Sequence, residues 1–130
     1  MEEYKMRRGE YLEEREPDLE AKIEDYFGPI TDTYEYKGSD LYIVGEPDNP
    51  VFSKIVAGTV EYDGKKNKLG VDFQERDLQE LMEMGEVDAA ENANRAKNDF
   101  LEECTGRDAK ARRESMKRAV EDDADAPDNV

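Results

Sequence analysis

The spacing of hydrophobic positions changes along the chain, and each spacing predicts a different secondary structure. Leu19, Ile23 and Phe27 recur every four residues, which is the spacing of one face of an α-helix. Pro17 suits a first helical position, and Gly28, itself followed by proline, is typical of the residue that ends a helix. We therefore predict a helix between Pro17 and Gly28.

The middle third of the chain instead carries short runs of β-branched and aromatic residues, separated by turn residues. Such runs predict strands that pair as hairpins. The predicted strands cover residues 30–36, 41–44, 54–62 and 69–73. In the last strand Leu69, Val71 and Phe73 alternate with Gly70 and Asp72. We therefore expect one face of an antiparallel sheet to be buried and the other face to be wet.

A helical spacing returns in the C-terminal third. Its apolar face is formed by Ala89, Ala93, Ala96, Phe100 and Cys104. Gly106 is expected to end this helix, and residues 107–120 are expected to form another. Residues 121–130 are acidic and contain a proline, which predicts a disordered tail. Residues 1–16 fit either a short strand or a short helix.

Together these elements predict one α+β domain at residues 1–120, followed by the tail at 121–130. The domain has two layers, in which an antiparallel sheet of about four strands is packed by an N-terminal helix and two C-terminal helices. A sheet of this kind needs a cover on its buried face, and the apolar faces of the helices supply it.

Charge changes this picture, because the chain carries 35 Asp and Glu residues against 19 Lys and Arg residues, a formal net charge of −16. High net charge with few large apolar residues is typical of disordered chains. The regular spacing of apolar residues favours a folded protein instead. In molar salt, the range of repulsion between carboxylates shrinks to about 3 Å. We therefore expect a folded protein adapted to a very salty cytoplasm.

Cysteine content and hydropathy also indicate the cytoplasm. The single Cys104 excludes an intrachain disulfide and fits a reducing compartment. No run approaches the roughly 20 apolar residues of a membrane-spanning helix. No apolar run follows Arg7 and Arg8, as one would in an export signal. We expect a cytoplasmic protein without membrane contact.

Several residue combinations that carry chemistry are missing from the sequence. The chain has no His, which excludes Ser-His-Asp, Cys-His and His-containing zinc sites. Neither the GxGxxG motif nor the P-loop motif of nucleotide-binding proteins occurs. Paired carboxylates could act as acid and base or hold a cation, but 35 acids bring such pairs together by chance. Cys104 lies on the apolar helical face, which favours a buried side chain over a nucleophile. We expect no cofactor, no metal site and no catalytic residue.

One segment departs from the acidic background. Residues 107–118 hold six basic and two acidic residues, a local charge of +4 that leaves −20 for the remainder of the chain. The candidate partner- or phosphate-binding residues are Arg107, Lys110, Arg112, Arg113, Lys117 and Arg118. They could contact a protein or neutralise acidic surface, or they could bind nucleic-acid phosphates. Because salt weakens phosphate binding, we favour protein contact.

Two further groups of residues bear on these alternatives. Lys65, Lys66 and Lys68 form a second basic cluster in a predicted turn, and a face shared by Lys65 and Arg112 would favour phosphate binding. The predicted strands also carry Tyr34, Tyr36, Tyr42 and Tyr62. These tyrosines could stack with bases, although half-buried packing is the more common role of tyrosine on a sheet.

Five stretches of the chain form a recognisable set: MRRGEYLEER, YFGPITDT, DNPVF, IVAG and GRDAK, at residues 6–15, 26–33, 48–52, 55–58 and 106–110. They resemble a family of short haloarchaeal proteins of unknown function. The resemblance covers nearly the whole chain up to the acidic tail, and it implies a salt-adapted cytoplasmic protein. It implies no activity, ligand or catalytic residue.

The sequence thus predicts a non-enzymatic protein-interaction or regulatory module that self-associates or binds a protein partner. The alternative is a nucleic-acid accessory protein that binds phosphate through residues 107–118. An enzyme that uses Asp or Glu on a small molecule is a third class, for which the sequence names no residue.

Overall fold

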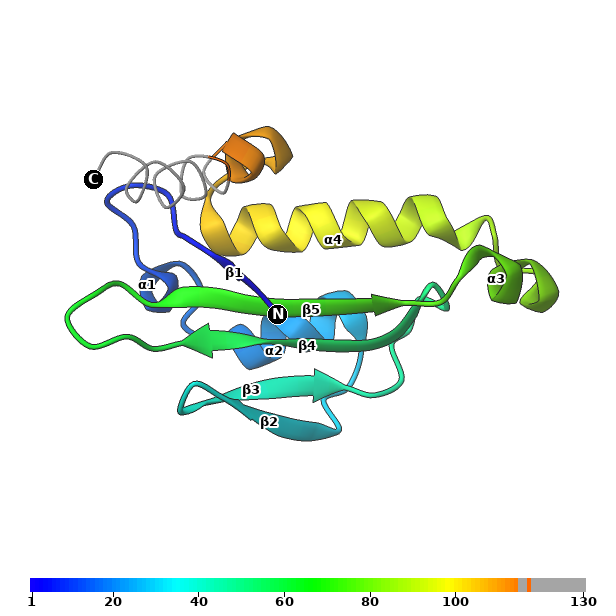
Figure 1. Cartoon of the computed structure of the whole chain (residues 1–130), viewed down its shortest axis with the longest axis horizontal. Coiled ribbons are helices and arrows are strands. Elements are labelled where there is room, and N and C mark those ends of the chain that lie inside the picture. The colour runs from blue at the N-terminus through cyan, green and yellow to red at the C-terminus, as the bar shows by residue number, and fades with distance from the viewer. Residues whose placement is uncertain (115–116, 118–130) are drawn as a thin grey trace, which may run out of the picture.

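The computed structural model describes residues 1–114 and residue 117, and Figure 1 shows their arrangement. In chain order the elements are β1 (Glu2–Tyr4), α1 (Leu12–Arg15), α2 (Leu19–Phe27), β2 (Asp32–Tyr36), β3 (Ser39–Val44), β4 (Phe52–Val60), β5 (Lys68–Glu75), α3 (Leu78–Met84) and α4 (Ala89–Thr105). The predicted α+β class is confirmed. The predicted tail at 121–130 and the candidate residue Arg118 lie outside the described residues.

The strands form one antiparallel sheet in the order β1-β5-β4-β3-β2. Its five strands exceed the predicted four, because β1 comes from N-terminal residues whose pattern fits a strand or a helix. β1 joins the sheet at one edge, where Glu3 pairs with Gly70 of β5. At the other edge, a two-residue turn at Lys37 and Gly38 joins β2 to β3. Both turn residues have positive φ, 50° and 81°, as hairpins with a right-handed twist favour.

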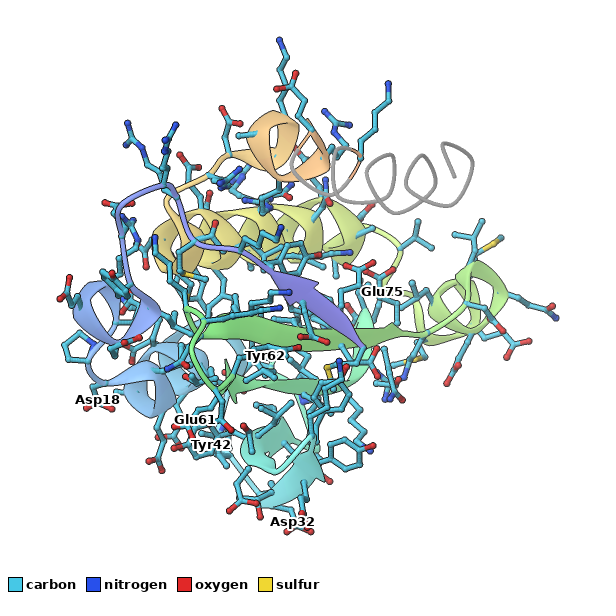
Figure 2. The ribbon with its side chains drawn as sticks, turned by 60° about the vertical axis from the view of Figure 1, so that its left-hand side comes forward. Asp18, Asp32, Tyr42, Glu61, Tyr62 and Glu75 are labelled. Atoms are coloured by element: carbon cyan, nitrogen blue, oxygen red, sulfur yellow. The ribbon has the colours of Figure 1, made fainter. Side chains whose placement is uncertain are left out.

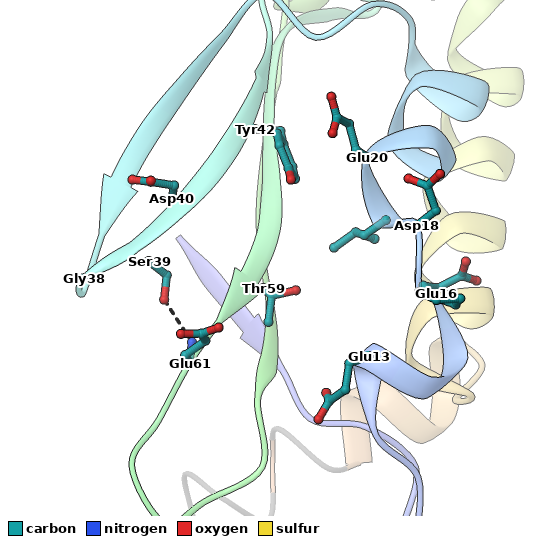
Figure 3. Close-up of a pocket in the computed structure, with 12 residues that line it drawn as sticks. Glu13, Glu16, Asp18, Glu20, Gly38, Ser39, Asp40, Tyr42, Thr59 and Glu61 are labelled. Carbon is teal, nitrogen blue, oxygen red and sulfur yellow. Dashed lines mark hydrogen bonds between the residues drawn. The ribbon is translucent and has the colours of Figure 1, made fainter.

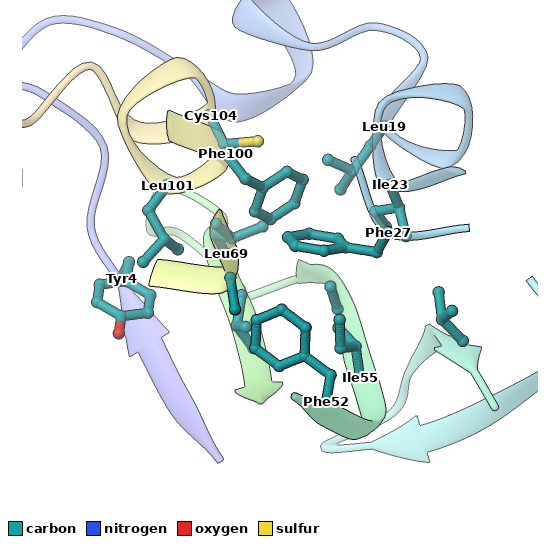
Figure 4. Close-up of a cluster of buried hydrophobic side chains, with 14 of the residues drawn as sticks. Tyr4, Leu19, Ile23, Phe27, Phe52, Ile55, Leu69, Phe100, Leu101 and Cys104 are labelled. Atoms are coloured by element: carbon teal, nitrogen blue, oxygen red, sulfur yellow. The ribbon is translucent and has the colours of Figure 1, made fainter. Parts of the chain in front are cut away.

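α2 and α4 supply the helical side of the main core, and Phe27 of α2 lies among its aromatic rings (Figure 4). The centroid of the Phe27 ring is 5.0 Å from that of Phe100 in α4. It is 5.5 Å from Phe73 and 5.9 Å from Phe52, both in the sheet. These edge-to-face contacts join two helices to two strands. The predicted apolar faces of both helices are therefore confirmed.

Capping residues set the helix ends. Asp18 is the N-cap of α2, and its Oδ1 accepts a hydrogen bond of 3.1 Å from the Ala21 amide. Pro17 therefore precedes the cap, and its predicted place as the first helical residue was wrong. An aspartate satisfies a free amide of the first turn, which proline cannot do. The predicted ends are confirmed, since Gly28 follows α2 and Gly106, with a φ of 76°, follows α4.

The sheet face opposite the helices carries a second apolar cluster, formed by Leu41, Val56 and Val60. Gly58 and Gly70 make this packing possible. A Cβ on Gly58 would lie 2.9 Å from Leu41 Cδ2, and one on Gly70 would lie 2.7 Å from Val60 Cγ2. The expectation of a wet face was wrong here, because glycine inside a strand permits close approach by a neighbour.

Two C-terminal features complete the fold. α3 is not predicted by the sequence pattern. It begins after the N-cap Asp77, ends at Gly85, and lies at the opposite end of the sheet from the turn between β4 and β5 (Figure 1). Residues 109–114 and 117 are helical, as predicted for the segment after Gly106. Across the described residues, no helix combines the length and the apolar character needed to cross a membrane.

Candidate functional site

Basic side chains from three separate segments line one cleft, whose volume is about 420 Å³. Its lining residues are Lys5, Met6, Arg8, Lys65, Lys66, Asn67, Lys68 and Arg107. Six of these eight residues are cationic and none is acidic, although the chain has a net charge of −16. We call this surface the basic cleft.

Hydrogen bonds and strand pairing hold the three segments of the basic cleft together. The Arg7 amide donates to the carbonyl oxygen of Thr105 at 2.7 Å, and the Arg107 guanidinium donates to the carbonyl oxygen of Met6 at 3.3 Å. Met6, 4% exposed, anchors this N-terminal segment in the core. Pairing of β1 with the start of β5 brings the turn between β4 and β5 to the same place. The basic cleft is therefore a product of the tertiary fold.

The six cations of the basic cleft are not paired with carboxylates of the described residues. Within the described part of the chain, none of them forms an ion pair at 4.0 Å or less. Other cations do form such pairs, for example Lys22 with Glu103 at 3.1 Å. The Nε atom of Arg107 is buried, and it has no hydrogen-bond partner among the described residues.

Two tyrosines border the basic cleft through its lysines. Lys66 Nζ lies 4.8 Å from the ring centroid of Tyr11, and Lys68 Nζ lies 5.1 Å from that of Tyr62. Such cation–π contacts hold an ammonium group in place without neutralising its charge. Both lysines are therefore positioned and still positive.

The structure separates the five candidate residues of the basic segment that it describes. Arg107 lines the basic cleft. Arg112 is 5% exposed, and its guanidinium donates to the Arg107 carbonyl oxygen at 2.6 Å and to Asn98 Oδ1 at 3.1 Å. The other three, Lys110, Arg113 and Lys117, are exposed on the helical segment and do not line the cleft. Lys65 therefore shares a surface with Arg107 and not with Arg112.

Sequence reasoning assigned no role to Lys5 and Arg8, which complete the basic cleft. A signal was present, since residues 5–8 hold three basic residues in an acidic chain. These residues lie far from Lys65 in the sequence, and only the pairing of β1 with β5 joins the two regions. That pairing could not be predicted while residues 1–16 fitted a strand or a helix.

A second hollow has the opposite charge. It has a volume of about 550 Å³ and lies between the α1–α2 region and the strands β3 and β4 (Figure 3). Its lining includes six carboxylates, and three of its members, Asp18, Tyr42 and Glu61, can be located in Figure 2. Burial raises the pKa of Glu16 in this hollow, and Lys22 partly offsets the effect. Within residues 1–114 and 117, no group of three or more Cys, Asp or Glu side chains is placed to hold a metal ion.

Comparison with known proteins identifies the family. The model described as "Domain of unknown function (DUF5611)" matches residues 1–118. The chain belongs to the DUF5611 family. No curated protein and no solved structure matches it. The predicted resemblance to a family of unknown function is confirmed, and a haloarchaeal origin stays a prediction.

The DUF5611 match spans every segment that builds the basic cleft, from Lys5 to Arg107. The residues that line the basic cleft therefore lie within the matched part of the chain. The acidic residues after position 118 fall outside the match.

In this DUF5611 chain the single cysteine is an interior residue. Cys104 is fully buried at 0% exposure. Burial raises the pKa of its thiol to about 12, with further increases from Glu16 and Glu103. A thiol with so high a pKa forms little thiolate near neutral pH. The prediction of a buried, apolar Cys104 is confirmed.

Proposed function

We propose that this DUF5611 protein is a non-enzymatic binding module that holds a phosphate-bearing ligand in the basic cleft. One observation carries the proposal: six cations and no carboxylate line a single cleft in a chain whose net charge is −16. Lys and Arg are the side chains that pair most strongly with phosphate oxygens. The ligand would lie between the N-terminal segment, the turn between β4 and β5, and Arg107.

The electrostatics of the basic cleft favour an anionic ligand. Cations held close together repel one another, and this repulsion lowers the stability of the fold. The chain has 35 carboxylates, yet no described one pairs with these cations. A phosphate group that neutralises the cluster also ties three chain segments together. Its binding is therefore expected to raise the melting temperature.

Concentrated salt should weaken phosphate binding less in a cleft than on an exposed basic helix. Salt weakens contacts between solvent-exposed charges most, and partly buried contacts less. Lys65 and Lys66 are exposed, but Lys68 and Arg107 are half-buried. The half-buried pair therefore supplies the part of the binding that survives in salt.

Calorimetric titration with inorganic pyrophosphate tests the proposal. We expect the wild-type protein to bind, and the double variant Lys65→Gln, Lys66→Gln to bind about tenfold more weakly, since each exposed charge contact contributes about 0.2–1 kcal/mol. The matched control is Lys110→Gln, Arg113→Gln, which removes the same charge from the helical segment outside the cleft. We expect the control to bind as the wild type does.

The same experiment separates the cleft from the basic segment as a whole. If the control variant loses as much affinity as the cleft variant, binding depends on net charge and the cleft assignment is wrong. If pyrophosphate fails to bind to the wild-type protein at the lowest salt that preserves the fold, the proposed function is wrong.

A second candidate function is protein contact through α3. Three apolar side chains are exposed on this helix, Leu78 at 64%, Met82 at 64% and Met84 at 46%, and a fourth, Val87 at 40%, follows it. Exposed apolar patches of this kind mark association surfaces. We propose that this patch mediates self-association, and sedimentation in molar KCl tests it. Leu78→Gln, Met82→Gln should shift the protein to a smaller species, whereas Tyr34→Gln, an exposed apolar change on β2, should not.

We also propose that the protein works in a cytoplasm of high salt. The support is the net charge of −16, because a folded chain with this charge repels itself strongly in dilute buffer. Salt shortens the range of that repulsion. A comparison of the melting temperature in low and in molar salt tests it.

A further inference from the structure

The aromatic ring at the edge of the basic cleft is fixed in place while its surface stays accessible. Tyr11 precedes α1, and its carbonyl oxygen accepts hydrogen bonds from the amides of Glu14 and Arg15 at 3.1 and 3.0 Å. The next residue, Leu12, is buried at 1% exposure. These hydrogen bonds and the burial of Leu12 therefore fix the backbone of Tyr11. Its side chain is nonetheless 41% exposed.

Lys66 lies on this ring, since its Nζ is 4.8 Å from the ring centroid of Tyr11. Lys66 also lines the basic cleft, so the Tyr11 ring, which is not itself part of the lining, borders the cleft through Lys66. A π face beside a group of cations is the arrangement that proteins use to bind nucleotides of a single strand, where bases stack and phosphates pair with Lys or Arg.

The size and walls of the basic cleft also exceed what a phosphate ion requires. Its volume is about 420 Å³, within the range of about 300–1,000 Å³ typical of sites for small organic molecules. Met6 and the aliphatic stems of the lysines supply apolar wall. A ligand with a planar apolar part and a charged part matches both portions of this surface.

We propose that the ligand of the basic cleft is a nucleotide, whose base stacks on Tyr11 while its phosphate lies among Lys66, Arg107 and the other cations. This inference rests on the proposed function and adds the ligand class to it. The base takes the ring face that Lys66 now covers, and Lys66 turns to the phosphate. The nucleotide is either free or one unit of a single-stranded nucleic acid, because both present the same base and phosphate.

Titration with three probes tests the inference: inorganic pyrophosphate, adenosine diphosphate and a uridine decanucleotide. Adenosine diphosphate carries the pyrophosphate group together with a base and ribose. We expect at least one of the two base-containing probes to bind about fivefold or more tightly than pyrophosphate, as stacking of one base implies. Tighter binding of adenosine diphosphate identifies a free nucleotide, and tighter binding of the decanucleotide identifies a single strand.

Three variants test whether the base of the ligand stacks on the Tyr11 ring. Tyr11→Leu should remove the advantage of the base-containing probe while pyrophosphate binding is unchanged, and Tyr11→Phe should keep that advantage because it keeps the ring. Tyr34→Leu is the matched control, since Tyr34 is 48% exposed on β2 and, among the described contacts, its ring lies under none of the lysines of the basic cleft. It should leave all three affinities unchanged.

Each contrary result has a distinct meaning. If all three probes bind equally and Tyr11→Leu changes nothing, the nucleotide inference is overturned and the phosphate-binding function stands. An advantage that survives Tyr11→Leu overturns the placement of the base on Tyr11. If no probe binds to the wild-type protein, both the inference and the proposed function are overturned.

Discussion

The Glu3 carboxylate on β1 accepts a hydrogen bond of 2.9 Å from the Tyr36 hydroxyl on β2, although these two strands form opposite edges of the sheet. The same carboxylate accepts hydrogen bonds from Lys37 Nζ at 2.9 Å and from the Tyr62 hydroxyl. Flat neighbouring strands lie about 4.8 Å apart, so contact between the two edges requires a strongly curved sheet. Gly70, the partner of Glu3 on β5, leaves the space that this curvature needs.

Glu3 should make stability depend on pH at the acidic end. Burial raises its pKa, but hydrogen bonds from Tyr62, Lys37 and Tyr36 outweigh burial and lower the pKa from 4.5 to about 2. Because the folded value lies below the unfolded value, the ionised carboxylate adds stability above pH 4.5, and this stability is lost as the pH falls toward 2. Glu3→Gln should lower the free energy of unfolding at pH 7 by about 2 kcal/mol.

Denaturant melts between pH 7 and pH 2 check this expectation. The difference between wild type and Glu3→Gln should shrink through the interval in which Glu3 is protonated. With the melts run in molar KCl, where repulsion among carboxylates is screened, Glu83→Gln, an exposed change on α3, is the control and should melt as the wild type does. A Glu3→Gln difference that stays constant across this pH range would show that the carboxylate charge contributes nothing.

Gly58 should not tolerate a methyl group. A Cβ there would lie 2.9 Å from Leu41 Cδ2 and 3.0 Å from Leu41 Cα. Gly58→Ala should lower the free energy of unfolding by about 1–2 kcal/mol, since overpacking outweighs the gain from a stiffer unfolded chain. A double-mutant cycle with Leu41→Ala provides the measurement. The double variant should be more stable than the sum of the two single effects predicts, and strict additivity would contradict the contact.

Much of the fold could be predicted from local patterns. Leu19, Ile23 and Phe27 place one face of α2 in the core because a helix repeats about every four residues. The second face of the sheet could not be predicted in this way. Gly58 and Gly70 interrupt the alternation, and their meaning depends on Leu41, which reaches them from β3. Such contacts between strands have no signature within one strand.

The basic cleft was predicted only in part, for a related reason. Lys65 and Arg107 belong to the two basic clusters that the sequence displays, and the structure brings them together. Arg112 belongs to the same basic segment but turns inward, where Asn98 and the Arg107 carbonyl satisfy its guanidinium. The number of charges in this segment does not show which arginine is exposed and which is buried. That depends on which face of the helical segment packs against the rest of the domain.

Cys104 should be inert in the native protein. Its side chain is fully buried, and burial raises its pKa to about 12. A thiol-specific reagent at pH near 8 should label it only after the protein is unfolded in denaturant, because the thiolate is the reactive form. Leu78→Cys supplies an internal control, since Leu78 is 64% exposed and a thiol there should react in the native state. Rapid native labelling of the wild-type protein would contradict the buried position.

Salt should stabilise the fold. The net charge of −16 produces repulsion among carboxylates, and this repulsion is screened over about 10 Å in 0.1 M salt but over about 3 Å in molar salt. The melting temperature should therefore rise between about 0.1 M and about 3 M KCl. Glu83→Gln, Glu86→Gln removes two exposed charges, one on α3 and one just after it, and should raise the melting temperature in low salt more than in high salt. A wild-type melting temperature that is equal at both salt concentrations would rule out adaptation to salt.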